Sequence, residues 1–169
     1  LSNGNIGAVA TAFVDFYNND EDIILSTYDG VLATAKINSP TNFKKIRSNI
    51  KNLIQYDNFY FHEHYGIKDI LVIKDKLYVA YIGQKKNDCY DLRIINANLN
   101  KNFLDFKLQY QTKECISVEN THGFWAHQGA GGRMVALDES HILFTTGDFR
   151  NRPLAQEITS EFGKILKIN

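Results

Sequence analysis

The sequence predicts an all-β fold made of antiparallel sheets of the kind that form the blades of a β-propeller. Three observations lead to this prediction. Apolar residues fall in short runs rich in Val, Ile, Tyr and Phe, turn residues join pairs of these runs, and the pairs recur along the chain. The chain has 169 residues, 44% of them hydrophobic and 12% aromatic, which suffices for a single domain over 1–169 with a hydrophobic core.

Three hairpins are predicted in chain order. Asp29-Gly30 joins the runs at 23–28 and 31–37, because both residues tolerate the positive φ of a tight turn. Lys74-Asp75 joins 69–73 to 76–82, and residues 138–140 join 133–137 to 141–146. Similar strands begin near 23, 76 and 141, and each is followed by a further strand, at 31–37, 92–97 and 164–168. If the additional residues of each repeat lie in loops, the spacing of the repeats is close to the roughly 40–50 residue period of propeller blades.

One segment has a different pattern. Phe43, Ile46, Ile50 and Leu53 lie at helical spacing after Pro40. We expect either a short helix near 42–55, packed outside the sheets, or a fourth blade strand at the same place.

Charge and hydropathy exclude two classes of partner. The 19 basic and 19 acidic side chains cancel, so the chain lacks the positive charge that binding to nucleic acid requires. No apolar run approaches the roughly 20 residues of a membrane-spanning helix. The chain begins at Leu1 without a secretory signal pattern, and a mature or excised product, its targeting segment removed, is expected.

The two cysteines, Cys89 and Cys115, are too few and too far apart for a structural zinc site. They form either one disulfide or two buried thiols. A disulfide would place the protein in an oxidising compartment.

The segment 120–148 holds the candidate chemistry. Around His127 it combines four glycines in fourteen residues with the only tryptophan of the chain. A histidine on such a loop is a candidate general base, because its pKa near 6.5 lets it accept a proton at neutral pH. The alternative is a glycine-rich turn whose histidine caps neighbouring backbone. His62 and His64 have the spacing of a metal site but need a third ligand from afar, His122 or Glu119, so no metal-binding residue is predicted.

Motifs from Trp125 to Asn169 resemble the glucose/sorbosone dehydrogenase family, the quinoprotein sugar dehydrogenases. The first motif is His127-Gln128, followed by Gly131-Gly132-Arg133. The others are Thr-x-Gly-Asp at 145–148, Ala-Gln followed by Ser at 155–160, and Gly-Lys-Ile at 163–165.

This resemblance implies a six-bladed β-propeller of which the chain carries about three four-stranded blades, an N-terminal half that continues beyond 169 in the intact protein. It implies pyrroloquinoline quinone (PQQ) and calcium as cofactors, with most of their ligands on later blades outside the chain. His127 would be the catalytic base, and Gln128, Gly131 and Gly132 would bind the cofactor. Arg133 would begin the inner strand, while 147–148 and 163–164 would be turn and strand-closing elements.

The function implied by the resemblance is a PQQ-dependent dehydrogenase that oxidises a sugar, an aldose or a related alcohol by hydride transfer to the quinone. The alternative is a non-catalytic propeller module that binds carbohydrate or protein. The expected macromolecular partner is the remaining half of the propeller or a second copy of the chain. The expected location is periplasmic or secreted.

Overall fold

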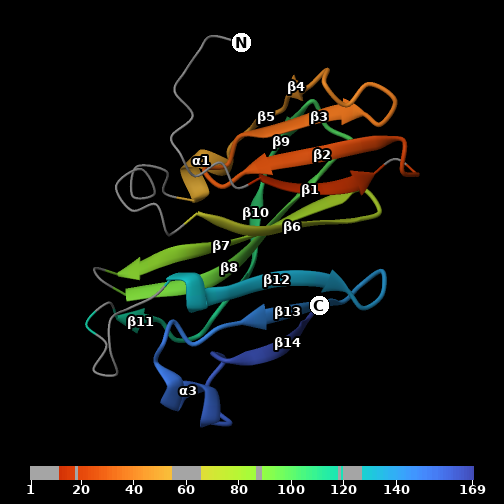
Figure 1. The fold of residues 1–169 in the computed structure, drawn as a ribbon. Helices are drawn as coiled ribbons and strands as arrows, with labels where there is room; N and C mark the ends of the chain where they lie inside the picture. The colour runs from red at the N-terminus through yellow and green to blue at the C-terminus, as the bar shows by residue number, and fades with distance from the viewer. Residues whose placement is uncertain (1–11, 18, 55–65, 87–88, 118, 120–126) are drawn as a thin grey trace.

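The computed structural model describes residues 12–17, 19–54, 66–86, 89–117, 119 and 127–169, and most regular structure in these ranges is β (Figure 1). The strands are β1 (Ala12–Tyr17), β2 (Asp22–Thr27), β3 (Leu32–Lys36), β4 (Lys44–Lys45), β5 (Arg47–Ser48), β6 (Ile67–Ile73), β7 (Lys76–Lys86), β8 (Cys89–Asn98), β9 (Phe103–Leu104), β10 (Lys107–Gln111), β11 (Ile116–Ser117), β12 (Gly131–Ala136), β13 (Ile142–Thr146) and β14 (Lys164–Ile168). The helices are α1 (Ile50–Leu53), the 3₁₀ turn η1 (His127–Ala130) and α3 (Arg152–Gln156). No helix in these ranges is long and apolar enough to cross a membrane.

Three antiparallel sheets carry the fold. The first has the order β1-β2-β3-β4, the second β10-β8-β7-β6 with β11 paired to β8, and the third β12-β13-β14. The three predicted hairpins are confirmed as β2–β3, β6–β7 and β12–β13. The predicted repeat is confirmed too, since β2, β7 and β13 are the second strands of their sheets and β3, β8 and β14 the third.

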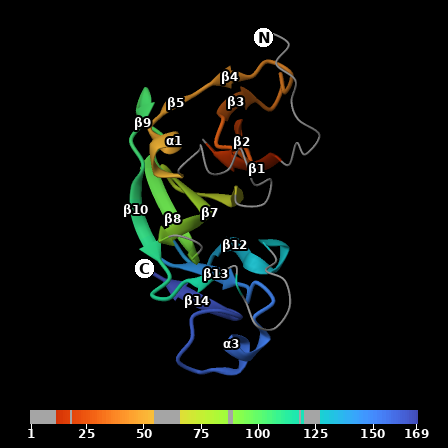
Figure 2. The ribbon, with the colours of Figure 1, turned by 90° about the vertical axis from the view of Figure 1, so that its left-hand side faces the viewer.

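The sheets are arranged as neighbouring blades of a β-propeller. β6, the first strand of the second sheet, contacts β1 and β12, the first strands of the other two. We call β1, β6 and β12 the inner strands. The sheets follow one another from β4 to β14 in Figure 1, and Figure 2 shows β10 along the edge of the molecule, far from β12. The chain therefore builds three consecutive blades, the third with three strands among the described residues.

A carboxylate joins each inner strand to the next. Asp15 of β1 accepts a hydrogen bond from the backbone N–H of Val72 in β6, at 2.6 Å. Asp69 of β6 accepts one from the N–H of Met134 in β12, at 2.7 Å. An inner strand has no strand partner on its free edge, and these carboxylates satisfy N–H groups that would otherwise be unpaired. The contacts fix the position of each blade relative to the next.

The core lies on both faces of the middle blade, as the continuous apolar runs predict. Apolar side chains on both faces of β7 and β8 are almost fully buried from solvent. They are Leu77, Val79, Ala80, Ile82, Leu92, Ile94 and Ile95. A blade between two others is buried on both sides, and strict apolar and polar alternation is therefore absent.

The expected helix near 42–55 is shorter than its pattern suggests. Residues 44–45 form β4, the fourth strand of the first blade, and residues 47–48 pair in parallel with β9. The helix α1 spans only Ile50–Leu53. Its buried Ile50, with Ile54, packs beneath Gly30, whose φ of +84° suits the β2–β3 turn. Pairing with strands distant in sequence overrides the local helical spacing, so both expected structures occur in succession.

Candidate functional site

The predicted base lies at the entrance to the third inner strand. η1 begins at His127 and ends at Ala130, and β12 follows at Gly131 without a break. The backbone of His127 and Gln128 is described, but their side chains fall outside the described part of the structure, as do His62, His64 and His122.

The predicted glycine motif at 147–148 holds η1 in place. The N–H of Gly147 donates to the carbonyl of Ala130 at 2.6 Å, and the N–H of Phe149 donates to the carbonyl of Gly129 at 3.1 Å. A Cβ on Gly147 would lie 1.7 Å from the Gly129 oxygen, so a side chain at this position is incompatible with the contact. The Thr-x-Gly-Asp motif therefore anchors the segment that carries His127.

A buried pair of aromatic rings supports the 147–149 segment. Phe149 has a left-handed backbone (φ 51°), which turns its fully buried ring onto Phe162 in an edge-to-face contact at 5.8 Å. The N–H of Gly163 donates to the carbonyl of Gly147 at 3.2 Å. The ammonium group of Lys164 donates to three carbonyls, of residues 154, 155 and 162. The Gly-Lys motif thus closes the loop between α3 and β14 around the anchor.

The glycines predicted to bind cofactor both have left-handed backbones. Gly131 (φ +74°) is exposed, and a Cβ there would meet the backbone of Gly147 at 2.6 Å. Gly132 (φ +96°) is buried, and its missing Cβ leaves room for the Cβ and Cγ of Lys68 in β6, which would lie 2.5 and 2.9 Å from it. Gly132 therefore has a packing role between the second and third blades, and Gly131 has one against the backbone at the end of β13.

Two charged residues of β6 meet this segment, and sequence reasoning did not single out either. The β6–β7 register shifts between Ile67 and Asp69, so that Lys68 is the extra residue of a bulge. The pKa of Lys68 is lowered to about 8 by burial. The pKa of Asp69 is raised by burial, against the hydrogen bond from Met134 and the charge of Arg133, whose guanidinium lies 3.3 Å from the carboxylate. The only signal in the sequence was a lysine and an aspartate at the start of an apolar strand.

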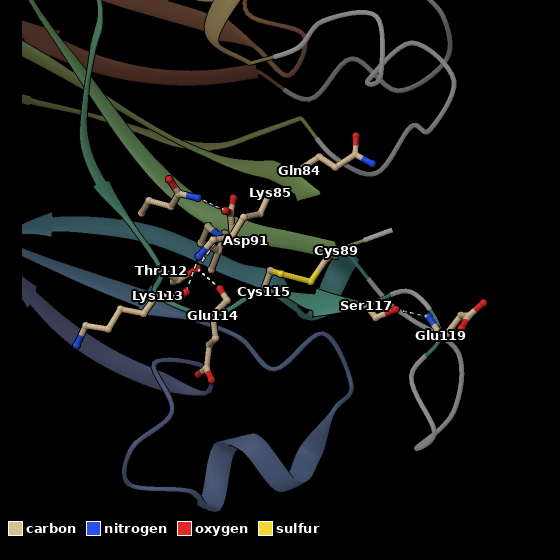
Figure 3. Close-up of a disulfide and its surroundings, with 12 residues drawn as sticks. Gln84, Lys85, Cys89, Asp91, Thr112, Lys113, Glu114, Cys115, Ser117 and Glu119 are labelled. Atoms are coloured by element: carbon tan, nitrogen blue, oxygen red, sulfur yellow. Dashed lines mark hydrogen bonds between the residues drawn. A yellow bond between two sulfur atoms is a disulfide. The ribbon is translucent and has the colours of Figure 1, made fainter. Parts of the chain in front are cut away.

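The second and third blades are also joined beyond the inner strands. Glu114 accepts a hydrogen bond from the hydroxyl of Ser160 and one from the N–H of Glu161, the latter at 2.9 Å. Glu114 precedes Cys115, which forms a disulfide with Cys89, the first residue of β8 (Figure 3). This settles the open choice for the two cysteines. The disulfide ties the β10–β11 loop to its own blade, and that loop holds the 160–161 turn of the next blade.

The described residues contain no group of three or more His, Cys, Asp or Glu side chains that could hold a metal ion. The described residues of this region include the cations Lys68 and Arg133 and the exposed Gly131. The start of β12 combines positive charge with glycines, an arrangement that suits an anionic, planar ligand. A histidine next to it, His127, could exchange a proton with a bound substrate.

Comparison with known proteins points to one family. The model of the glucose / sorbosone dehydrogenase family matches residues 14–169. A solved glucose dehydrogenase superposes on 95% of this chain with a TM-score of 0.68 at 13% sequence identity, and a second covers 94% with a TM-score of 0.67 at 15% identity. The soluble aldose sugar dehydrogenase of Escherichia coli, in its apo form, covers 94% with a TM-score of 0.63 at 12% identity.

The chain spans 48%, 44% and 43% of these three structures, in the same order. At such identities the likeness shows the fold. No curated protein sequence matches the chain significantly.

Proposed function

Because the chain belongs to the glucose/sorbosone dehydrogenase family, we propose that it forms the part of a quinoprotein sugar dehydrogenase that carries the catalytic base. The observation that supports this most is the family match over 14–169, together with the anchoring of η1 by the glycine motif. The substrate class is a sugar, an aldose or a related alcohol. When bound, pyrroloquinoline quinone supplies the acceptor for the hydride.

In this proposal His127 removes the proton. The carbon that carries the sugar hydroxyl is oxidised by loss of a hydride, while the hydroxyl proton passes to the neutral imidazole. Two backbone hydrogen bonds from the 147–149 segment, to the carbonyls of Gly129 and Ala130, hold the turn η1 that begins at His127.

The described residues fit the quinone, which is a planar tricarboxylate. The side chains of Lys68 and Arg133 provide positive charge, and Gly131 is exposed at the start of β12. Gln128, Gly131 and Gly132 remain the predicted cofactor residues, with Gly132 acting through its contact with Lys68. For calcium the described residues offer no cluster of ligands, and no step is routed through it.

We further propose that more blades complete the ring. The face of the third blade opposite its buried side exposes Val135 and Ile165, at 57% and 70%. The first blade exposes Val14 and Phe16, both at 53%. Apolar sheet faces of this kind are normally covered by a neighbour. The remaining half of the propeller is the occupant that we favour, and light scattering that detects only a stable dimer of this chain would instead favour a second copy.

A periplasmic or secreted location is part of the proposal. The Cys89–Cys115 disulfide supports it, because such bonds persist in oxidising compartments.

The test is reconstitution of the full-length protein with pyrroloquinoline quinone and calcium, followed by dye reduction with a panel of aldoses. His127→Ala should lower kcat by about 10²- to 10⁴-fold, the range for loss of a general base. The control is His141→Ala. His141 lies in the β12–β13 turn, its Nδ1 2.7 Å from a carboxylate oxygen of Asp138, at the end of the blade away from η1. Equal rates for parent and His127→Ala would remove His127 from the mechanism, and absence of quinone binding would favour a non-catalytic module.

A further inference from the structure

We propose that the first blade carries an accessory site that binds a neutral saccharide of one or two sugar units. A cavity of about 350 Å³ lies over this blade, lined by residues of its four strands and of the 37–43 loop that joins β3 to β4. This volume is at the small end of the range for ligand pockets, roughly 300–1,000 Å³. The inference does not depend on the reaction proposed for His127.

One face of the first blade forms the floor of the cavity. Tyr17 of β1 pairs with Asp22 of β2, and Asp22 pairs with Lys36 of β3, so the three side chains lie in a row on one face. Asp15 lies on the same face by strand alternation, and its carboxylate reaches β6 of the second blade. The exposed apolar residues that we assign to a further blade lie on the opposite face. That blade would therefore not cover the cavity.

The cavity lies far from the candidate active site. Tyr17 is the last residue of β1, whereas η1 immediately precedes the first residue of β12. β1 and β12 run in the same direction in Figure 1, so the end of β1 and the start of β12 are on opposite sides of the molecule. A ligand in the cavity therefore binds without meeting the reacting groups.

The polar groups of the floor are held in fixed positions. The ammonium group of Lys36 contacts both carboxylate oxygens of Asp22, at 2.8 and 3.0 Å. The hydroxyl of Tyr17 is 2.7 Å from that of Thr34, and Thr34 donates its own proton to the carbonyl of Ile23 at 2.9 Å. Tyr17 is therefore the donor to Thr34, and its oxygen keeps lone pairs that can accept a hydrogen bond from a ligand.

The wall of the cavity supplies polar side chains that the fold does not use. Ser39, Asn42 and Lys44 line it, and their side chains have no hydrogen-bond or ion-pair partner within the part of the chain that the structure describes. Two successive turns hold the loop that carries them. The N–H of Ser39 donates to the carbonyl of Lys36 at 2.9 Å, and the N–H of Asn42 donates to the carbonyl of Ser39 at 3.0 Å.

This combination of groups favours a sugar over an ion. An anion needs only donors and a metal ion needs only acceptors, whereas each sugar hydroxyl both donates and accepts. The cavity offers both kinds, since the amide of Asn42 and the hydroxyl of Ser39 donate and accept, and the oxygen of Tyr17 accepts. The charges of Asp22 and Lys36 cancel, which leaves Lys44 as the one unneutralised charge among the lining residues. A neutral ligand with many hydroxyl groups therefore fits best.

The test is isothermal titration calorimetry of the full-length protein without quinone, with maltose, cellobiose and sucrose as the neutral probes and inorganic phosphate as the anionic probe. Asn42→Ala removes an amide of the wall, and Lys44→Met removes its ammonium group. Each has a matched control. Asn38 is exposed in the same loop and does not line the cavity, and Lys45 follows Lys44 on the other face of β4.

We expect at least one of the three saccharides to bind the parent. Asn42→Ala should weaken this binding by about 3- to 10-fold, as for loss of one hydrogen bond, and the double variant with Lys44→Met by about 10- to 100-fold. Asn38→Ala and Lys45→Met should match the parent, and phosphate should not bind.

Three results would overturn the inference. They are a parent that binds none of the saccharides, a double variant that binds them like the parent, and an equal loss in the Asn38→Ala and Asn42→Ala proteins. Binding of phosphate alone, weakened by Lys44→Met, would also overturn it by showing an anion site. None of these results affects the proposed reaction, since all the variants should retain the dehydrogenase activity of the parent. An inactive parent that still binds a saccharide through Asn42 would overturn the proposed function and leave this inference in place.

Discussion

The anchoring of η1 by the 147–149 segment predicts a large difference between two neighbouring glycines. A Cβ added at Gly147 would lie 1.7 Å from the carbonyl oxygen of Gly129, which is backbone and cannot rotate away. Gly147→Ala must therefore separate the two segments. It breaks the hydrogen bonds from the N–H groups of Gly147 and Phe149, at 2.6 and 3.1 Å. Each is worth about 0.5–1.5 kcal/mol, and overpacking adds about 1–3 kcal/mol, so we expect a loss of about 2–6 kcal/mol.

Gly129→Ala is the matched control. Its Cβ would meet no atom closer than 3.5 Å, and its stability should stay within about 1 kcal/mol of the parent. The assay is equilibrium urea unfolding of the full-length protein, followed by circular dichroism, with the midpoint and slope fitted for each variant. The reasoning is refuted if Gly147→Ala is as stable as the parent, or if both substitutions cost the same.

Other contacts between and within blades lead to further predictions. Asp69→Ala leaves the N–H of Met134 unsatisfied and should cost about 1–3 kcal/mol in urea unfolding, whereas Asp69→Asn, which keeps an acceptor oxygen, should cost less; equal losses would contradict this. Burial raises the pKa of Asp69, so the folded state favours its protonated form. The parent should therefore lose stability relative to Asp69→Asn as the pH rises above 3.8, and a gain in stability would contradict this direction. Replacing Cys89 and Cys115 by serine opens a loop with a sequence separation of 26 and should cost about 3–4 kcal/mol, a difference that dithiothreitol abolishes; an unchanged midpoint would show that the disulfide adds no stability.

The parts of the fold that could be predicted from sequence are those fixed by local chemistry. Asp29-Gly30 and Lys74-Asp75 mark tight turns between β-rich runs, and both hairpins form there. The spacing of these hairpins was enough to predict blades. By contrast, Arg47 pairs in parallel with Phe103 across more than fifty residues, and no local pattern indicates such a contact. The sequence therefore left a helix and a strand open near 42–55, where the strand β4 and the short helix α1 both form.

The candidate site, like the fold, could be predicted only in part from the sequence. The motif around His127 marked the segment, because a histidine among closely spaced glycines is visible in one stretch of sequence. The contact of Lys68 with Gly132, and that of Asp69 with Met134, each join residues more than sixty positions apart. Each depends on two blades lying side by side, and the sequence shows only a lysine and an aspartate in an apolar strand.

The most direct measurement is a single-turnover reaction of the full-length protein loaded with pyrroloquinoline quinone and calcium. An aldose is added without an electron acceptor, and the absorbance of the bound quinone is followed in the parent and in His127→Ala. The account predicts rapid reduction in the parent and reduction slowed by at least about 10²-fold in the variant, with quinone binding unchanged. Equal reduction rates in the two proteins, or a quinone-loaded parent that no aldose reduces, would contradict it.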